Sequence, residues 1–168
     1  MGKLAKDKIY ACALPMPNSY NPQKDEWVKA IADAIGDPGE EIFLVGHSLG
    51  APAILRYLET LPENKKIGGA VLVSGPYKPI IYPDNININK IDHFINYPFN
   101  FDKIKKVCPQ FSIIHGDNDD VVPFSHAEYF SKNLNCGIFS VKNGQHLSGG
   151  AGWFELPEAL QALEKMIK

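Results

Sequence analysis

The chain has 168 residues, of which 45% are hydrophobic and 21% charged, and this balance predicts one globular domain, residues 1–168, that buries a core without disulfide bonds. A formal net charge of −2 argues against nucleic-acid and membrane partners. The three cysteines are widely spaced and form neither a metal-ligand pattern nor a disulfide framework, so we expect them to be reduced thiols in the core. The sequence shows no signal peptide and no membrane-spanning stretch, and we therefore expect a cytoplasmic protein.

The first half of the chain alternates short apolar runs with helical patterns. Residues 8–14 form an apolar run that predicts a buried strand, and a proline-rich loop follows it. Residues 23–35 carry apolar side chains at helical spacing. A strand at 41–45, a helix at 51–61 and a buried strand at 69–74 come next.

The segment after the third strand is different, because it is rich in Pro, Asn, Tyr and Phe and has weak periodicity. It is too long for a plain connection, so we expect a cap-like insertion around residues 76–106, either fixed or acting as a gate. Its aromatic residues are candidates for an acyl pocket, although we expect most of them to cover the core instead: Tyr77, Tyr82, Phe94, Tyr97, Phe99 and Phe101. Tyr77 is the best candidate for contacting substrate, because it follows a strand end closely.

The last third of the chain resumes the alternation. It predicts a strand at 111–115, a helix at 124–133, a strand at 137–142 and a terminal helix at 157–167. About five strands alternating with helices predict an α/β fold, with a mostly parallel, doubly wound sheet and helices on both faces. The strands are continuous apolar runs, as expected when both faces are covered.

The strand at 41–45 leads into a G-x-S-x-G sequence, Gly46-His47-Ser48-Leu49-Gly50. Between a strand and a helix, this motif is typical of a nucleophile elbow, which exposes one serine above the end of a sheet. We expect both glycines to be needed, because side chains there would clash in so tight a turn. The alternative is a glycine-rich loop with a capping serine. Ser48 is thus a candidate nucleophile, and His47 is expected to orient the turn and face substrate.

Candidates for an acid and a base follow the last two strands. Sites in open parallel sheets form beyond the carboxyl ends of strands, where Asp117, Asp119, Asp120 and His146 are located. The order serine, acid, histidine is that of an α/β-hydrolase triad. Asp119 is favoured because G-x-x-D-x-x-V-P is a recurrent acid loop of these enzymes. Asp117 is interpreted as a turn residue, and Asp120 as a solvated residue or loop brace.

In this hypothesis His146 takes the proton of Ser48, and Asp119 holds the imidazole in the correct tautomer. The backbone N–H of Leu49 provides half of an oxyanion hole at the start of a helix. The clustered carboxylates lack the spacing of a calcium loop, so we expect no metal. The remaining histidines are expected to be structural: His93, His115 and His126.

Six stretches spread over most of the chain resemble the small YdeN-like serine hydrolases, the family that includes retinoblastoma-binding protein nine. They are Leu14–Asn18, Asp25–Trp27, the motif around Ser48 with Ala53–Glu59, Tyr97–Ile104, His115–Asp119 and Gly152–Pro157. The resemblance implies the α/β-hydrolase fold, a triad of Ser48, Asp119 and His146, small ester or amide substrates, and no cofactor.

One departure from that family bears on activity. Its members begin with a further strand, a His-Gly loop and a helix that supply the second oxyanion donor, a unit of roughly 25–30 residues that is not matched here. Three explanations are open. In the first, the strand at 8–14 takes the vacant place beside 41–45, with Met16 or Asn18 offering an N–H, which Pro15 and Pro17 lack. Alternatively a second copy covers the gap as a homodimer, or the protein is a degraded relative that folds but catalyses poorly.

Three functions are therefore open. We favour a carboxylesterase that acts on small acyl esters. A non-catalytic interaction protein on the same fold is the second, because the first unit is unmatched. A thioesterase, amidase or acyltransferase that uses the same triad is the third, and the sequence does not separate it from an esterase.

Overall fold

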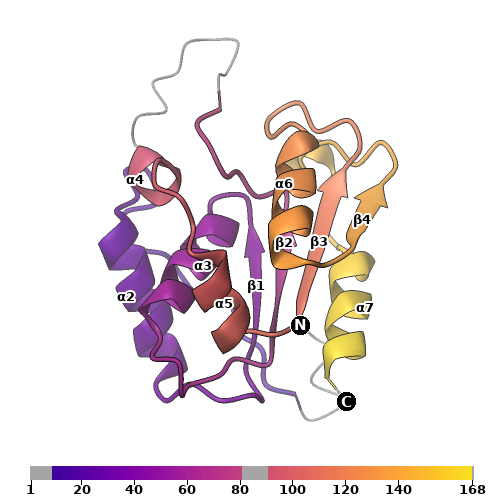
Figure 1. The fold of residues 1–168 in the computed structure, drawn as a ribbon. Helices are drawn as coiled ribbons and strands as arrows, with labels where there is room; N and C mark the ends of the chain where they lie inside the picture. The colour runs from indigo at the N-terminus through magenta and orange to yellow at the C-terminus, as the bar shows by residue number, and fades with distance from the viewer. Residues whose placement is uncertain (1–8, 81–90, 168) are drawn as a thin grey trace.

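The computed structural model describes residues 9–80 and 91–167. Its centre is a sheet of four parallel strands in the order β1-β2-β3-β4, which is also their order along the chain (Figure 1). The strands are β1 (Phe43–His47), β2 (Gly69–Val73), β3 (Phe111–Gly116) and β4 (Ile138–Val141). All neighbours pair in parallel, so the loops that follow β1, β3 and β4 meet at one edge of the sheet.

Helices cover both faces of this sheet, as expected (Figure 1). On one face, α3 packs against β1 and β2 and α6 against β3 and β4, while α2 and α5 pack on α3; α7 lies on the other face, against β2 and β3. The bounds are α2 (Lys24–Ile35), α3 (Gly50–Thr60), α4 (Asp92–Ile95), α5 (Phe101–Val107), α6 (Ser125–Leu134) and α7 (Pro157–Met166), with a short 3₁₀ helix η2 (Gly149–Ala151) before α7. Among the described helices, none is both long and apolar enough to cross a bilayer.

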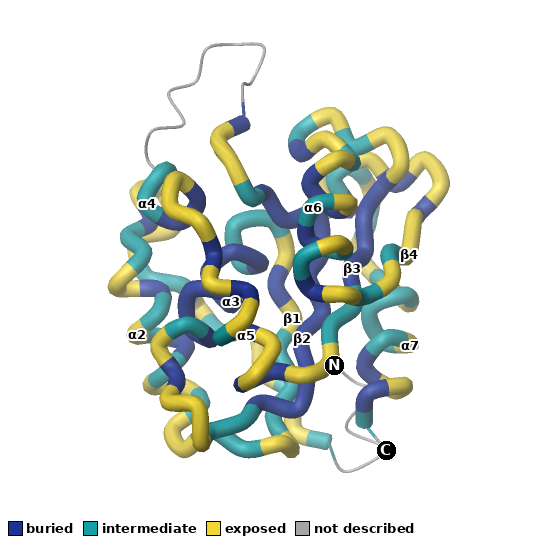
Figure 2. The backbone as a smooth tube through the Cα atoms, in the orientation of Figure 1, coloured by how far each residue is buried: buried dark blue, intermediate teal, exposed yellow. Residues whose placement is uncertain are grey.

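The strand β2 separates two cores. Successive side chains of a strand point to opposite faces, so Ala70 and Leu72 pack with the helices α3 and α5, whereas Val71 and Val73 pack with α7. Every residue of β2 is buried (Figure 2). This double burial explains why the strands have continuous apolar runs instead of alternating patterns.

The edge strand β1 is covered less completely. Val45 is paired in register with the buried Val71 and so faces the α7 side of the sheet, yet it is 49% exposed. The reason is that α7 packs mainly over β2 and β3.

The expected strand at 8–14 is wrong. Residues 9–14 have no strand pairing, and residue 8 lies outside the described part of the chain, so the described sheet has four strands and not about five. Tyr10 is 89% exposed. An apolar run becomes a strand only where a neighbouring edge accepts its backbone hydrogen bonds, which a sequence pattern does not reveal. The expectation of core thiols is correct for the buried Cys108 and wrong for Cys12, which is exposed.

The described parts of the segment predicted as a cap-like insertion are residues 76–80 and 91–106. Phe94, Phe99 and Phe101 are buried in the core beside α3, whereas Tyr97 is exposed and Tyr82 lies outside the described residues. Arg56 of α3, itself buried, donates from Nε to the Phe94 carbonyl at 2.8 Å and lies 4.0 Å from the centre of the Phe99 ring. This part of the segment therefore closes the core.

Candidate active site

The turn between β1 and α3 holds Ser48 in a left-handed conformation, with φ of 52°. A residue with a side chain adopts this region only at a cost. The Ser48 N–H donates to the Val73 carbonyl at 2.8 Å, which fixes the turn to the end of β2. A Cβ on Gly46 would lie 2.6 Å from the backbone of Gly50, so the expected clash is present there. It is absent at Gly50, where nothing lies within 4 Å of an added Cβ.

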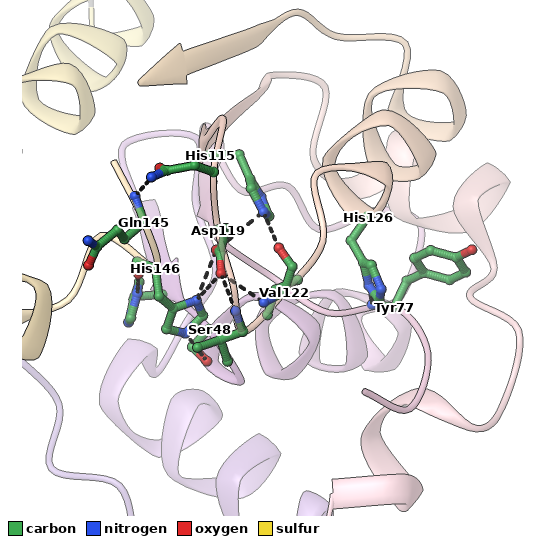
Figure 3. Close-up of polar contacts among 11 residues, drawn as sticks. Ser48, Tyr77, His115, Asp119, Val122, His126, Gln145 and His146 are labelled. Carbon is green, nitrogen blue, oxygen red and sulfur yellow. Dashed lines mark hydrogen bonds and ion pairs between the residues drawn. The ribbon is translucent and has the colours of Figure 1, made fainter. Parts of the chain in front are cut away.

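Three side chains from three strand ends form one hydrogen-bonded chain (Figure 3). Ser48 Oγ lies 3.1 Å from His146 Nε2, and His146 Nδ1 lies 3.0 Å from Asp119 Oδ2. A carboxylate only accepts hydrogen bonds, so the imidazole Nδ1 carries the proton and Nε2 is left to accept from the serine hydroxyl. The structure thus brings together the predicted nucleophile, base and acid.

The Asp119 side chain is fully buried and well supplied with donors. Its Oδ1 accepts from the N–H groups of Val121 at 2.9 Å and Val122 at 2.8 Å. Burial works to raise the pKa of Asp119, but the hydrogen bonds from His146, Val122 and Val121 outweigh it and hold the pKa below its ordinary value. The carboxylate is therefore ionised at neutral pH and available to orient His146.

The three candidate positions for the acid have separate roles. We call residues 117–122 the acid loop and residues 143–147 the histidine loop. Asp117 Oδ1 accepts from the Asn143 N–H at 2.7 Å, and Asp120 is exposed. Only Asp119 reaches the imidazole. In addition, Asn118 Oδ1 accepts from the Gln145 N–H at 2.8 Å. Three successive residues of the acid loop thus each bind a residue of the histidine loop.

The end of β3 also meets the histidine loop backbone to backbone. A Cβ on Gly116 would lie 2.1 Å from the Gln145 carbonyl oxygen, so only glycine permits this approach. The histidine loop has three residues with positive φ, at 54°, 49° and 48°: Asn143, Gln145 and Leu147. Leu147 is a large side chain in a strained conformation, and its burial against the α7 side of the sheet compensates for this.

His47 has a partner that the sequence did not indicate. Its Nε2 lies 2.8 Å from the carbonyl oxygen of His146. A carbonyl only accepts, so Nε2 is the donor. Burial lowers the pKa of His47 more than this hydrogen bond raises it, and the ring is therefore neutral at neutral pH. His47 thus holds the backbone of the histidine loop at His146. The prediction that it faces substrate stays a prediction.

The other predicted site residues lie around this centre. Leu49 precedes α3, and its N–H is among the N-terminal groups that lack an intrahelical acceptor. Met16 is half-buried and packs on the core. Tyr77 stacks on Tyr129 with ring centres 3.7 Å apart, beside His126 (Figure 3). The oxyanion roles of Leu49 and Met16 and the substrate role of Tyr77 stay predictions.

The histidines expected to be structural have structural partners. His93 Nε2 lies 3.0 Å from the Pro22 carbonyl. His126 is buried, and its Nδ1 accepts from the Tyr77 N–H at 3.0 Å; burial lowers the pKa of His126 to about 4. The described residues contain no group of three or more His, Cys, Asp or Glu side chains that is arranged to hold a metal.

Comparison with known proteins gives matches over nearly the whole chain. A family model described as serine hydrolase matches residues 3–165. The YdeN protein of Bacillus subtilis (strain 168) is 32% identical over 155 residues, 92% of this chain and 79% of that protein. The serine hydrolase RBBP9 of Rattus norvegicus is 21% identical over 152 residues, 90% of this chain and 75% of its own. The crystal structure of the B. subtilis ydeN gene product matches with a TM-score of 0.90 at 30% identity, covering 98% of this chain and 86% of that one.

Proposed function

Because the chain belongs to the serine hydrolase family and has the α/β-hydrolase fold, we propose that it is a carboxylesterase that cleaves small acyl esters through a covalent acyl-enzyme. The membership confirms the resemblance that the sequence motifs indicated. Hydrolase activity follows from the family. The ester substrate, the small acyl group and the three-residue mechanism are our proposal.

The observation that supports it is the unbroken chain of hydrogen bonds from Ser48 through His146 to Asp119. In the first step Ser48 Oγ attacks the ester carbonyl carbon while His146 Nε2 takes the hydroxyl proton. The imidazolium then gives this proton to the leaving alkoxide, and an acyl-Ser48 ester remains. A water molecule, deprotonated by His146, attacks that ester; the bond between the acyl carbon and Ser48 Oγ breaks, His146 returns the proton to Oγ, and the carboxylic acid leaves.

The negative charge on the carbonyl oxygen needs donors. We assign one to the Leu49 N–H, at the positive end of the α3 dipole. Met16 is the proposed source of the second. If it provides none, the rate of each acyl-transfer step falls by about 10²–10³, and a slow but measurable esterase results.

Three proteins test the proposal: wild type, Ser48→Ala, and Ser140→Ala as a matched control on the exposed part of β4. We expect wild type and Ser140→Ala to hydrolyse p-nitrophenyl acetate and to be labelled by a fluorophosphonate, and Ser48→Ala to do neither. Equal labelling of the Ser48→Ala variant would exclude Ser48 as the nucleophile. Absence of labelling in folded wild type would favour the non-catalytic interaction protein.

A second experiment separates chemistries that share the same residues. We expect a panel of small esters, acyl thioesters and amides to give the highest kcat/KM for esters. A preference of more than tenfold for thioesters or amides would identify a thioesterase or amidase and would overturn the ester proposal while keeping Ser48 as nucleophile. Formation of an acyl amide from an added amine would indicate an acyltransferase.

A further inference from the structure

His115, on β3, is a fully buried imidazole directly behind the proposed catalytic acid. Its Nε2 lies 2.8 Å from the Val122 carbonyl oxygen and 3.3 Å from Asp119 Oδ2. Figure 3 shows the ring beside the acid loop, on the far side of Asp119 from Ser48. Asp119 Oδ2 therefore lies close to two imidazoles, those of His146 and His115.

The surroundings fix the protonation of His115. The Val122 carbonyl only accepts, so Nε2 carries the proton. The opposite nitrogen, Nδ1, is buried and has no hydrogen-bond partner among the residues that the structure describes. Protonation would bury both an unpaired N–H and a charge, and burial accordingly lowers the pKa of His115. This side chain is therefore a neutral hydrogen-bond donor at neutral pH.

A histidine is a costly choice at this position. An unpaired buried nitrogen destabilises a fold, whereas an apolar side chain of similar size would pack beside Phe124 without that cost. Among the described residues, the polar contacts of the His115 side chain go to the acid loop alone. They reach Val122, whose N–H binds Asp119 Oδ1, and Asp119 Oδ2 itself.

We propose that His115 is a positioning residue for Asp119: its Nε2–H fixes the carbonyl of Val122 and supports Oδ2, so that the carboxylate stays aimed at His146 Nδ1. This inference rests on the proposed function for its effect on rate. Independently of any reaction, the hydrogen bond between His146 and Asp119 should depend on the proton that His115 carries on Nε2.

Two amide variants form a matched pair for the test. A glutamine at 115 places its amide nitrogen near the position of the histidine Nε2, whereas an asparagine reaches only the position of Nδ1. Both are neutral and polar. His115→Leu removes the donor together with the unpaired nitrogen and shows what an apolar side chain does at the same place.

We expect His115→Asn and His115→Leu to lower kcat for p-nitrophenyl acetate roughly 10-fold, the loss that follows from removing one buried hydrogen bond, here the one to the Val122 carbonyl. KM should change little, because the substrate does not contact His115. His115→Gln should recover most of kcat. Equal kcat in all four proteins would overturn the proposal, as would equal losses in the Gln and Asn variants.

Proton NMR of the His146 Nδ1–H gives a readout without turnover. We expect its downfield resonance in wild type and His115→Gln, and its shift or loss in His115→Asn. If wild type lacks esterase activity while this resonance behaves as expected, the proposed function fails and the positioning role stands. Nitrogen-15 spectra of wild type supply a measurement that needs no variant: a proton on His115 Nδ1 at neutral pH would overturn the inference.

Discussion

His47 Nε2 donates a hydrogen bond to the carbonyl oxygen of His146 at 2.8 Å. The residue that precedes the proposed nucleophile thus holds the backbone of the residue that we propose as the acceptor of its proton. A shift of the histidine loop, or of the turn that carries Ser48, would change the distance between Ser48 and His146, on which the proposed proton transfer depends. This contact makes the strand end of β1 and the histidine loop one unit.

We predict that His47→Leu lowers kcat for p-nitrophenyl acetate about 2- to 10-fold, the effect of one hydrogen bond that is partly open to water. His47→Gln, whose amide nitrogen reaches the same carbonyl, should recover part of the loss. Steady-state kinetics checks this. A rise in KM at unchanged kcat would instead support the sequence-based hypothesis that His47 faces substrate.

The acid loop offers a series of carboxylates with distinct contacts. Asp119→Asn should lower kcat about 10⁴-fold, because an amide in place of the carboxylate favours the wrong tautomer of His146. Asp120→Asn, at an exposed position, should retain wild-type activity. Steady-state kinetics with p-nitrophenyl acetate measures kcat of the two variants, and fluorophosphonate labelling rates report the reactivity of Ser48 in each. Comparable values in the two variants would contradict the assignment of Asp119 as the acid.

The two glycines of the G-x-S-x-G motif should respond differently to alanine. At Gly46 the new Cβ would meet the Gly50 backbone at 2.6 Å, so we expect a loss of about 1–3 kcal/mol in the free energy of unfolding and a drop of roughly 100-fold in labelling rate. Gly50→Ala meets no atom within 4 Å and should stay within about 1 kcal/mol of wild type. Urea unfolding monitored by circular dichroism distinguishes them; equal stability of the two variants would contradict this account.

Acid should destabilise the fold through the histidines whose pKa is lowered on folding, which are His47, His115 and, with the largest shift, His126. The pKa of His126 falls from the ordinary 6.5 to about 4 on folding, so the unfolded chain binds more protons between these values. The neutral form's contribution is complete above pH 6.5 and is lost as the pH falls toward 4, which amounts to about 3 kcal/mol. Asp119, whose pKa is lowered from 3.8, contributes only below this window.

The variant His126→Asn tests this assignment, because its side-chain oxygen can accept the Tyr77 N–H while the residue does not titrate. We expect the free energy of unfolding, measured by urea titration at pH 7 and pH 4.5, to fall less in His126→Asn than in wild type. An identical fall in both proteins would assign the acid sensitivity to other groups.

The homodimer that the sequence raised as one way of covering the first strand stays a prediction. Val45, on the edge strand β1, is 49% exposed and faces the α7 side of the sheet, where α7 packs mainly over β2 and β3. If two copies pair there, Val45→Lys should yield a monomer in sedimentation velocity. Phe139→Lys, on the opposite edge strand and 45% exposed, should leave the dimer intact. A wild-type monomer at all accessible concentrations would end the idea.

The α/β fold was predictable from the alternation of buried strands and helices, and the candidate residues from their places after strands. The carboxyl ends of parallel strands lie at the same end of a sheet, so the positions of Ser48, Asp119 and His146 after three strands predict that these side chains converge. An apolar run alone was less informative about whether a segment forms a strand. The run at 8–14 has the composition of a strand, but pairing depends on a neighbouring edge, which local sequence does not encode.

The sequence by itself determined which residue types stand at each strand end and in what order along the chain. Tertiary structure decided which carboxylate reaches His146, that His47 holds the histidine loop, that Gly50 has room for a side chain, and that His115 lies behind Asp119. The first two depend on the distance between loops that are far apart in the sequence, and the last two on the three-dimensional path of a tight turn and of a single loop. Such distances are set by how the strands pack side by side, and no periodicity or spacing within a single segment contains them.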